Sequence, residues 1–202
     1  MSDLYIEVAG AEVKAIIFDF DGVVLDSEEP DFWAWREIWS ELGHELALPE
    51  WAACIGTGQG EHTFEPLAQL VRRVGLPMGE QIDLERGMRA RHAARMAELM
   101  AGRPPLAGVV EWLTEAAAAG LKIGIASSSS RRWVQAHLAR LGLDEYFGVI
   151  SSFDDCGAKK PDPASYRLAC QLLGVAAPEA LAVEDSRNGL LAAKAAGLRC
   201  IV

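Results

Sequence analysis

The sequence predicts an α/β protein in which a Rossmann-like parallel sheet forms the core and an α-helical cap domain is inserted into it. Strand-length apolar segments alternate with helical segments after residue 103, a pattern typical of a parallel sheet with helices on both faces. An earlier strand-like segment, residues 13–18, is separated from this alternation by a long helical stretch. We therefore predict a core formed by residues 1–29 and 103–202, and a cap formed by residues 30–102.

The first core strand is expected over residues 13–18, where the run VKAIIF is short, apolar and rich in β-branched side chains. In the cap that follows, apolar residues recur three or four positions apart, which is the spacing of amphipathic helices. One helix is expected from about residue 30 to Gly43, and two more over 67–74 and 81–100. Four tryptophans are expected in the cap core rather than in a sugar-stacking surface: Trp33, Trp35, Trp39 and Trp51.

The rest of the core begins after the break at Pro104 and Pro105. Helices are expected over 109–119, 131–141, 163–173 and 188–196, and strands over 121–126, 149–151, 181–183 and 199–202. The chain ends within an apolar strand, and we expect a natural domain to continue from there into a loop and a helix.

The composition argues against several classes of protein. A formal net charge of -10 disfavours binding to the phosphate backbone of nucleic acids. No apolar run reaches the roughly 18 residues that span a bilayer, and residues 1–12 lack the pattern of a signal peptide. The four cysteines form no CxxC pair, and the four histidines lack zinc-ligand spacing. We therefore expect a cytoplasmic protein, a monomer or weak dimer, without nucleic-acid or membrane partners.

The first predicted strand ends directly in a pair of carboxylates, Asp19 and Asp21, followed by Gly22. A carboxylate can attack phosphorus, and a second one two residues later can protonate the leaving oxygen and then activate water. Gly22 would allow a sharp turn and leave room for a substrate. The alternative is an ordinary strand-to-loop transition, in which Asp and Gly are common.

Three later strand-to-helix connections also carry polar residues. Ser127 and Ser128 open a serine run whose hydroxyl and N–H groups could hold phosphate oxygens, although Ser129 or Ser130 could simply cap a helix. Lys160 could neutralise phosphate charge, or belong to a solvated lysine pair.

The last of these connections begins with two adjacent acids, Glu184 and Asp185. Acids that leave a buried strand favour a cation such as Mg²⁺, although Asp185 or Ser186 could be a helix N-cap. Because the carboxyl ends of parallel strands meet at one edge of a sheet, the strand-end groups together predict a phosphoryl-transfer site.

The motifs DFDGVVLDSE, IASSS, KKPDP and VEDSRNG, in this order, resemble those of the haloacid dehalogenase superfamily. The resemblance runs from residue 13 to the end of the chain. The chain is similar to the branch that has an α-helical cap after the first motif, which includes β-phosphoglucomutases and many small-molecule phosphatases. The resemblance therefore implies a Mg²⁺-dependent phosphoric monoester hydrolase whose partner is a small phosphorylated metabolite, with sugar phosphates among the candidates.

The resemblance also implies a role for each strand-end residue. Asp19 would be the nucleophile, and Asp21 would be the acid and base. Ser127 would hold the phosphate, and Lys160, rather than Lys159, would be the family's lysine. The implied magnesium ligands are Asp19, Asp21 (through its backbone carbonyl), Glu184 and Asp185. Dehalogenases of the superfamily lack the second acid of the first motif, so its presence here argues against dehalogenation.

The cap bears on the choice between a phosphatase and a mutase. Its segment 55–60 could contact the leaving group through Thr57 and Gln59, or be a plain interhelix loop. β-Phosphoglucomutases carry a histidine, an arginine and an asparagine where this chain has Asp31, Gln59 and Arg131. These departures favour a phosphatase. The candidate substrate-binding residues are Gly22, Ser128, Thr57, Gln59 and Arg131. A sugar-phosphate mutase remains the first alternative, and a non-catalytic binding protein of the same fold the second.

Overall fold

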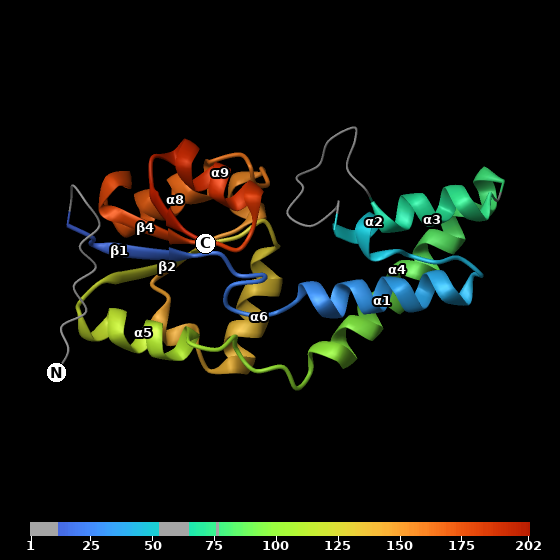
Figure 1. Ribbon diagram of the computed structural model, residues 1–202, viewed down its shortest axis with the longest axis horizontal. Coiled ribbons are helices and arrows are strands. Elements are labelled where there is room, and N and C mark those ends of the chain that lie inside the picture. The colour runs from blue at the N-terminus through green and yellow to red at the C-terminus, as the bar shows by residue number, and fades with distance from the viewer. Residues whose placement is uncertain (1–11, 53–64, 76) are drawn as a thin grey trace. The chain divides into compact units, whose positions relative to one another are not determined.

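The structure is a computed structural model that describes residues 12–52, 65–75 and 77–202. The chain forms two compact units (Figure 1). One unit joins Met1–Leu25 to Pro104–Val202, and the other is Asp26–Arg103. Each unit has its own hydrophobic core.

The first unit contains a five-stranded, fully parallel sheet in the order β3-β2-β1-β4-β5. Its strands are β1 (Ala15–Phe18), β2 (Lys122–Ala126), β3 (Val149–Ser151), β4 (Ala180–Val183) and β5 (Arg199–Ile201). The central strand is β1, where Phe18 is in register with Ile125 of β2 and Val183 of β4. This register brings the residues that follow the three strands to the same edge of the sheet.

Helices cover both faces of this sheet. They are α5 (Val109–Ala118), α6 (Arg131–Leu141), α7 (Phe153–Cys156), α8 (Ala164–Leu173) and α9 (Arg187–Ala196), with short 3-10 helices at Asp144–Tyr146 and Ala177–Glu179. In Figure 1, α8 and α9 lie on one side of the strands and α5 on the other. Ile17 of β1 packs in a core cluster with Ala169 of α8, while the neighbouring Phe18 meets the Trp112 ring of α5 edge-on at 6.4 Å. The predicted α/β fold with a parallel sheet is confirmed.

The second unit is built from α1 (Glu28–Glu41), α2 (Leu48–Ala52), α3 (Pro66–Val74) and α4 (Met78–Met100). As predicted, Trp35, Trp39 and Trp51 are buried in its core, where they cluster with Leu70 and Met88.

The prediction was wrong for Trp33, which is 40% exposed. Two residues before Trp35, it lies on the opposite side of α1, because successive residues of a helix are about 100° apart. The Arg36 guanidinium lies 5.0 Å from the centroid of the Trp33 ring.

The remaining differences from prediction concern the ends of elements and the shortest helices. Most boundaries shift by one or two residues, and α4 starts at Met78 instead of 81. Neither α2, with 5 residues, nor α7, with 4, is long enough to show a helical period in the sequence. Among the described residues, no helix has the length and apolar character needed to cross a membrane.

Candidate active site

The carboxylate of Asp19 lies immediately beyond the end of β1. The backbone N–H of Asp19 donates to the Val183 carbonyl at 2.9 Å, which continues the β1–β4 pairing by one residue. Oδ1 of Asp19 accepts hydrogen bonds from the Phe20 N–H and from Nζ of Lys160, both at 2.7 Å. The sheet therefore fixes the position of a buried carboxylate.

Lys160 connects this carboxylate to a second one. Its Nζ is 2.7 Å from Oδ1 of Asp19 and 2.6 Å from Oε1 of Glu184, and all three side chains are buried. Tyr166 of α8 also donates to Oε1 of Glu184, at 2.6 Å, and its ring centroid is 5.1 Å from Nζ of Lys160. Lys160 is thus held between two acids and against an aromatic ring.

Burial governs the ionisation of this cluster. It raises the pKa of Asp19 to about 8, against the opposing effect of Lys160, and the charge of Glu184 adds to the rise. Burial lowers the pKa of Lys160, but the charges of Asp19 and Glu184 outweigh it, so the net shift is upward. Burial, with Glu184 next, also raises the pKa of Asp185. Three acids beside one ammonium leave an excess of negative charge that a cation would neutralise.

Asp19, Glu184 and Asp185 offer carboxylate oxygens that all lie within 4.8 Å of one another. Such hard oxygen donors are the ligands that Mg²⁺ prefers. Gly22 makes room for one of them, because a Cβ at this position would clash with Oδ2 of Asp185. Oε1 of Glu184 already accepts from Lys160 and Tyr166. Among the described contacts, the carboxylate of Asp185 therefore has fewer protein partners that would compete with a metal ion. The donor set fits a magnesium ion.

Asp21 is held by two side chains that follow β2. Its Oδ2 accepts from Oγ of Ser129 at 2.5 Å, and its Oδ1 accepts from the indole Nε1–H of Trp133 at 2.9 Å. The structure thus brings α6 and the Asp21 carboxylate together within one unit.

The four serines 127–130 make different contacts. Ser127 is fully buried, and its Oγ accepts from the Ser129 N–H at 2.9 Å. Oγ of Ser128 accepts from the Lys160 N–H at 3.1 Å, which ties this loop to the lysine loop. Ser130 is the N-cap of α6. Helix capping and a close approach to Lys160 therefore coexist in the same four residues.

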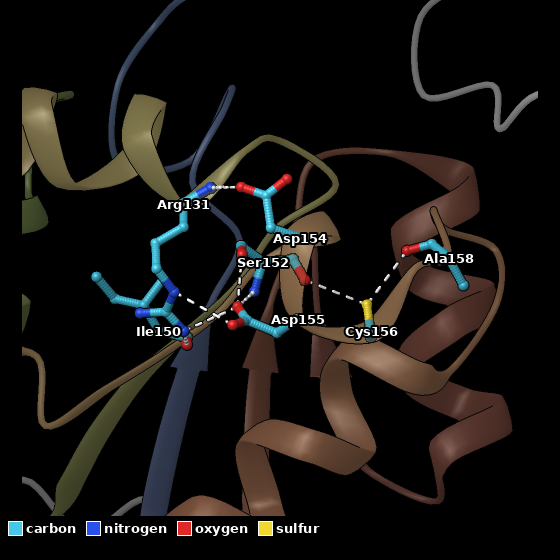
Figure 2. A network of polar contacts seen from close by, with 7 residues as sticks. All are labelled: Arg131, Ile150, Ser152, Asp154, Asp155, Cys156 and Ala158. Atoms are coloured by element: carbon cyan, nitrogen blue, oxygen red, sulfur yellow. Dashed lines mark hydrogen bonds and ion pairs between the residues drawn. The ribbon is translucent and has the colours of Figure 1, made fainter.

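Arg131 has protein partners (Figure 2). Its guanidinium donates to both carboxylate oxygens of Asp155, at 3.2 and 2.8 Å, and to the Ile150 carbonyl at 2.7 Å. Its backbone N–H donates to Oδ2 of Asp154 at 2.8 Å. To bind a substrate, the guanidinium would have to exchange or share these partners. Two further substrate-binding candidates, Thr57 and Gln59 of the predicted cap, lie outside the described residues.

Sequence reasoning missed Tyr166, and it considered Ser129 only as a helix cap and Trp133 not at all. Tyr166 is fully buried on the apolar side of α8, so its spacing is that of any core residue. A tryptophan in the first turn of α6, after a serine run that follows a strand, was a signal that could have been read. It places an indole N–H close to the edge where the strand ends meet.

Comparison with known proteins gives the wider class. A family model for haloacid dehalogenase-like hydrolases matches residues 13–197. YhcW of Bacillus subtilis (strain 168), a candidate phosphatase, is 43% identical over 190 residues, which cover 94% of this chain and 83% of that protein.

Two solved structures have similar folds. A candidate β-phosphoglucomutase from Thermotoga maritima has a TM-score of 0.74 and 28% identity, over 93% of this chain and 84% of the other. A mutant of CbbY from Rhodobacter sphaeroides, in complex with xylulose-(1,5)bisphosphate, has a TM-score of 0.72 and 32% identity, over 93% and 84% of the two chains.

The chain belongs to the haloacid dehalogenase-like hydrolase family, as its motifs predict. Within that family it is a phosphoric monoester hydrolase by class, the class that the phosphatase names among its relatives support.

Proposed function

We propose that the protein is a Mg²⁺-dependent phosphatase that hydrolyses a small phosphomonoester through an aspartyl-phosphate intermediate. The observation that carries this proposal is the buried Lys160 ammonium, which lies between Asp19 and Glu184 while Asp185 completes a three-carboxylate group. The proposal rests on the family as well, because all of these residues lie within the stretch, residues 13–197, that the family model matches.

In the first half-reaction, an oxygen of Asp19 attacks the phosphorus atom of the ester. An O–P bond forms to Asp19 as the bond from phosphorus to the leaving oxygen breaks. The carboxyl group of Asp21 gives its proton to that oxygen, and the alcohol leaves. Lys160 offsets the charge of Asp19 and of the approaching phosphate, so that two anionic groups can come together.

In the second half-reaction, Asp21 acts as a carboxylate and takes a proton from water. The water oxygen attacks phosphorus, the bond between phosphorus and Asp19 breaks, and inorganic phosphate leaves. Asp21 is then protonated and Asp19 is free, as they were before the first step. Ser127, with the N–H groups of its loop, is proposed to hold the phosphate oxygens.

Magnesium would be held by Asp19 and Asp185, with the Asp21 carbonyl and Glu184 as the further proposed ligands. When bound, it supplies positive charge that neutralises the phosphoryl oxygens and favours the ionised form of Asp19.

For the substrate, we propose a small phosphorylated metabolite of the sugar-phosphate class. The support is the likeness to CbbY, whose solved structure holds xylulose-(1,5)bisphosphate. We propose water as the acceptor of the phosphoryl group, because two residues at positions that differ from β-phosphoglucomutases are paired with other side chains. Asp31 pairs with His92 at 2.5 Å, and Arg131 pairs with Asp155.

The test is phosphate release from a panel of aryl, alkyl and sugar phosphates, with Mg²⁺ and after its removal by a chelator. We expect release with Mg²⁺, loss on chelation and recovery when Mg²⁺ is returned. Asp19→Asn should lower turnover by roughly a thousandfold or more, because it removes the nucleophile.

Asp83→Asn is the matched control, because it makes the same chemical change at an exposed residue of α4. It should leave turnover unchanged. A folded wild-type protein that releases phosphate from no member of the panel would contradict the proposal. A coupled assay that shows interconversion of sugar monophosphates, without net release of phosphate, would instead establish the mutase alternative.

A further inference from the structure

The indole of Trp133 and the hydroxyl of Ser129 together occupy both carboxylate oxygens of Asp21. Trp133 donates to Oδ1 at 2.9 Å and Ser129 to Oδ2 at 2.5 Å. Two directional donors, one on each oxygen, restrict both the position of a carboxyl group and its rotation. A single donor would leave the rotation free.

Trp133 is itself held in place. Its backbone N–H donates to Oγ of Ser130, the N-cap of α6, at 3.3 Å. Its ring meets His137 edge-on with centroids 4.2 Å apart, and the His137 ring lies 6.4 Å from that of Phe20, which is next to Asp21 in the chain. His137 therefore lies between the indole and the ring of Phe20, the residue that precedes Asp21.

The start of α6 is anchored to the neighbouring strand and helix. Arg131 donates to Asp155 and to the carbonyl of Ile150 in β3, and its backbone N–H donates to Asp154 of α7 (Figure 2). Because these contacts hold Arg131, they also hold the backbone of Trp133, which lies two residues later in α6. Rigid support of this kind is what keeps a proton-transferring group in register with the atom it serves.

We propose that Trp133 and Ser129 are positioning residues for Asp21, and that they align its carboxyl group with the leaving oxygen of the substrate. This inference rests on the proposed function, because it assigns to Asp21 the proton transfer described above. It adds two residues that act through Asp21 and do not touch the reacting phosphorus atom.

The consequence depends on the leaving group. An alkyl phosphate expels a strongly basic oxygen, which needs the proton from Asp21 as the P–O bond breaks. An aryl phosphate such as p-nitrophenyl phosphate expels a weakly basic oxygen that leaves with little help. General acid catalysis contributes typically 10²–10⁴-fold where it is needed, and misplacement of the acid forfeits part of it.

The experiment compares kcat/KM for p-nitrophenyl phosphate and for glycerol phosphate, because kcat/KM includes departure of the leaving group but not the later hydrolysis of the intermediate. Trp133→Phe keeps an aromatic ring and removes the N–H donor. We expect it to lower kcat/KM for glycerol phosphate by about tenfold and to leave the value for p-nitrophenyl phosphate nearly unchanged. Ser129→Ala should show the same dependence on the leaving group.

Trp112→Phe is the matched control, because Trp112 lies on α5 and contacts the ring of Phe18. It should leave both values unchanged. An equal loss for the two esters in Trp133→Phe would overturn the inference, since a purely structural defect does not distinguish leaving groups. A faster reaction with glycerol phosphate would also overturn it, because the indole would then hold Asp21 away from the substrate.

A second measurement does not depend on turnover. In a ¹⁵N-labelled protein, the indole N–H resonance of Trp133, assigned by its loss in Trp133→Phe, should move when Asp21 is changed to Asn. No movement would overturn the contact itself. If the wild-type protein releases phosphate from neither of these esters nor from any other member of the panel, the proposed function fails, and the catalytic role of the contact fails with it. If it hydrolyses other esters of the panel, the same comparison is made between an aryl and an alkyl ester that it accepts. If the wild-type protein releases phosphate but the effect of Trp133→Phe does not depend on the leaving group, only the inference about Trp133 and Ser129 is overturned.

Discussion

At the scale of single residues, Gly22 lies close against the carboxylate of Asp185. Gly22 has a φ of +83°, a conformation that side chains other than glycine adopt at a cost. A Cβ there would also clash with Oδ2 of Asp185. Gly22 therefore serves two needs at once, the turn after β1 and the space in which a proposed metal ligand lies.

The prediction for Gly22→Ala follows from the second need. The new methyl group should displace the Asp185 carboxylate and raise the Mg²⁺ dissociation constant by about tenfold or more. Titration calorimetry with Mg²⁺ measures this directly, without a substrate.

The control for this substitution is Gly108→Ala. Gly108 has a φ of +86°, but no atom lies within 4 Å of a Cβ built on it. It should cost similar backbone strain, on the order of 1 kcal/mol of stability, and leave Mg²⁺ binding unchanged. Equal effects of the two substitutions on Mg²⁺ affinity would mean that strain, and not the position of Asp185, is responsible.

The sequence sufficed to bring Asp19, Lys160, Glu184 and Asp185 together, because each follows a predicted strand and strand ends share an edge. It could not show which acid contacts the lysine. That depends on rotamers and on Tyr166, whose hydroxyl reaches Glu184 from a helix whose period marks only a buried face. The same holds for Asp21: the sequence places Trp133 near the strand ends, but it does not show that the indole contacts this carboxylate.

At the scale of elements, the polar network of Figure 2 joins α6 to β3 and α7. Asp155 lies at its centre. Its Oδ2 accepts from the N–H and the Oγ of Ser152, at 2.8 and 2.5 Å, and from Arg131. The single turn of α7 contains too few residues to be stable alone. The Asp155 carboxylate stabilises it by capping its first turn and by pairing with Arg131 of α6.

We predict that Asp155→Asn lowers the free energy of unfolding by about 1–2 kcal/mol, because an amide cannot replace a carboxylate that accepts from several donors. Burial by itself would raise the pKa of Asp155. The hydrogen bonds from Ser152 and from Arg131, with the charge of Arg131, lower this pKa by more than burial raises it, so the net shift is downward. A lowered pKa stabilises the folded state above the unfolded pKa, and this contribution disappears as the pH falls through the folded pKa.

Denaturant unfolding as a function of pH checks this prediction. The difference between the wild type and Asp155→Asn should be full at neutral pH and shrink in strong acid. Asp83→Asn, at an exposed pair within α4, should change stability little at any pH. A difference that persists unchanged in acid would show that the network contributes through packing and not through the charge of Asp155.

Most helices and strands were predictable because they are long enough to show a period, whereas α2 and α7 are not. The exposure of Trp33 was a different kind of error. Four tryptophans near one another suggested a single cluster, but the position of each on the helix decides which side it occupies.

At the scale of the whole molecule, the two units divide the chemistry unequally. Asp19, Lys160, Glu184 and Asp185 all belong to the unit that contains the sheet. The unit Asp26–Arg103 has a separate core around Trp39 and Leu70. Because the proposed metal ligands come from one unit alone, Mg²⁺ affinity should depend on the packing of that unit and not on the stability of the other.

Leu70→Ala and Ile17→Ala test this division with the same kind of change, since each deletes a fully buried aliphatic side chain from one of the two cores. Each should cost about 2–5 kcal/mol in the unit concerned. Leu70→Ala should leave the Mg²⁺ dissociation constant within about twofold of the wild type, because it shares no partner with the metal ligands. Ile17→Ala lies in β1 two residues before Asp19, and loosening this strand should weaken Mg²⁺ binding. Calorimetry with Mg²⁺ on both folded variants decides the matter, and an equal loss of affinity in the two would show that the units act as one.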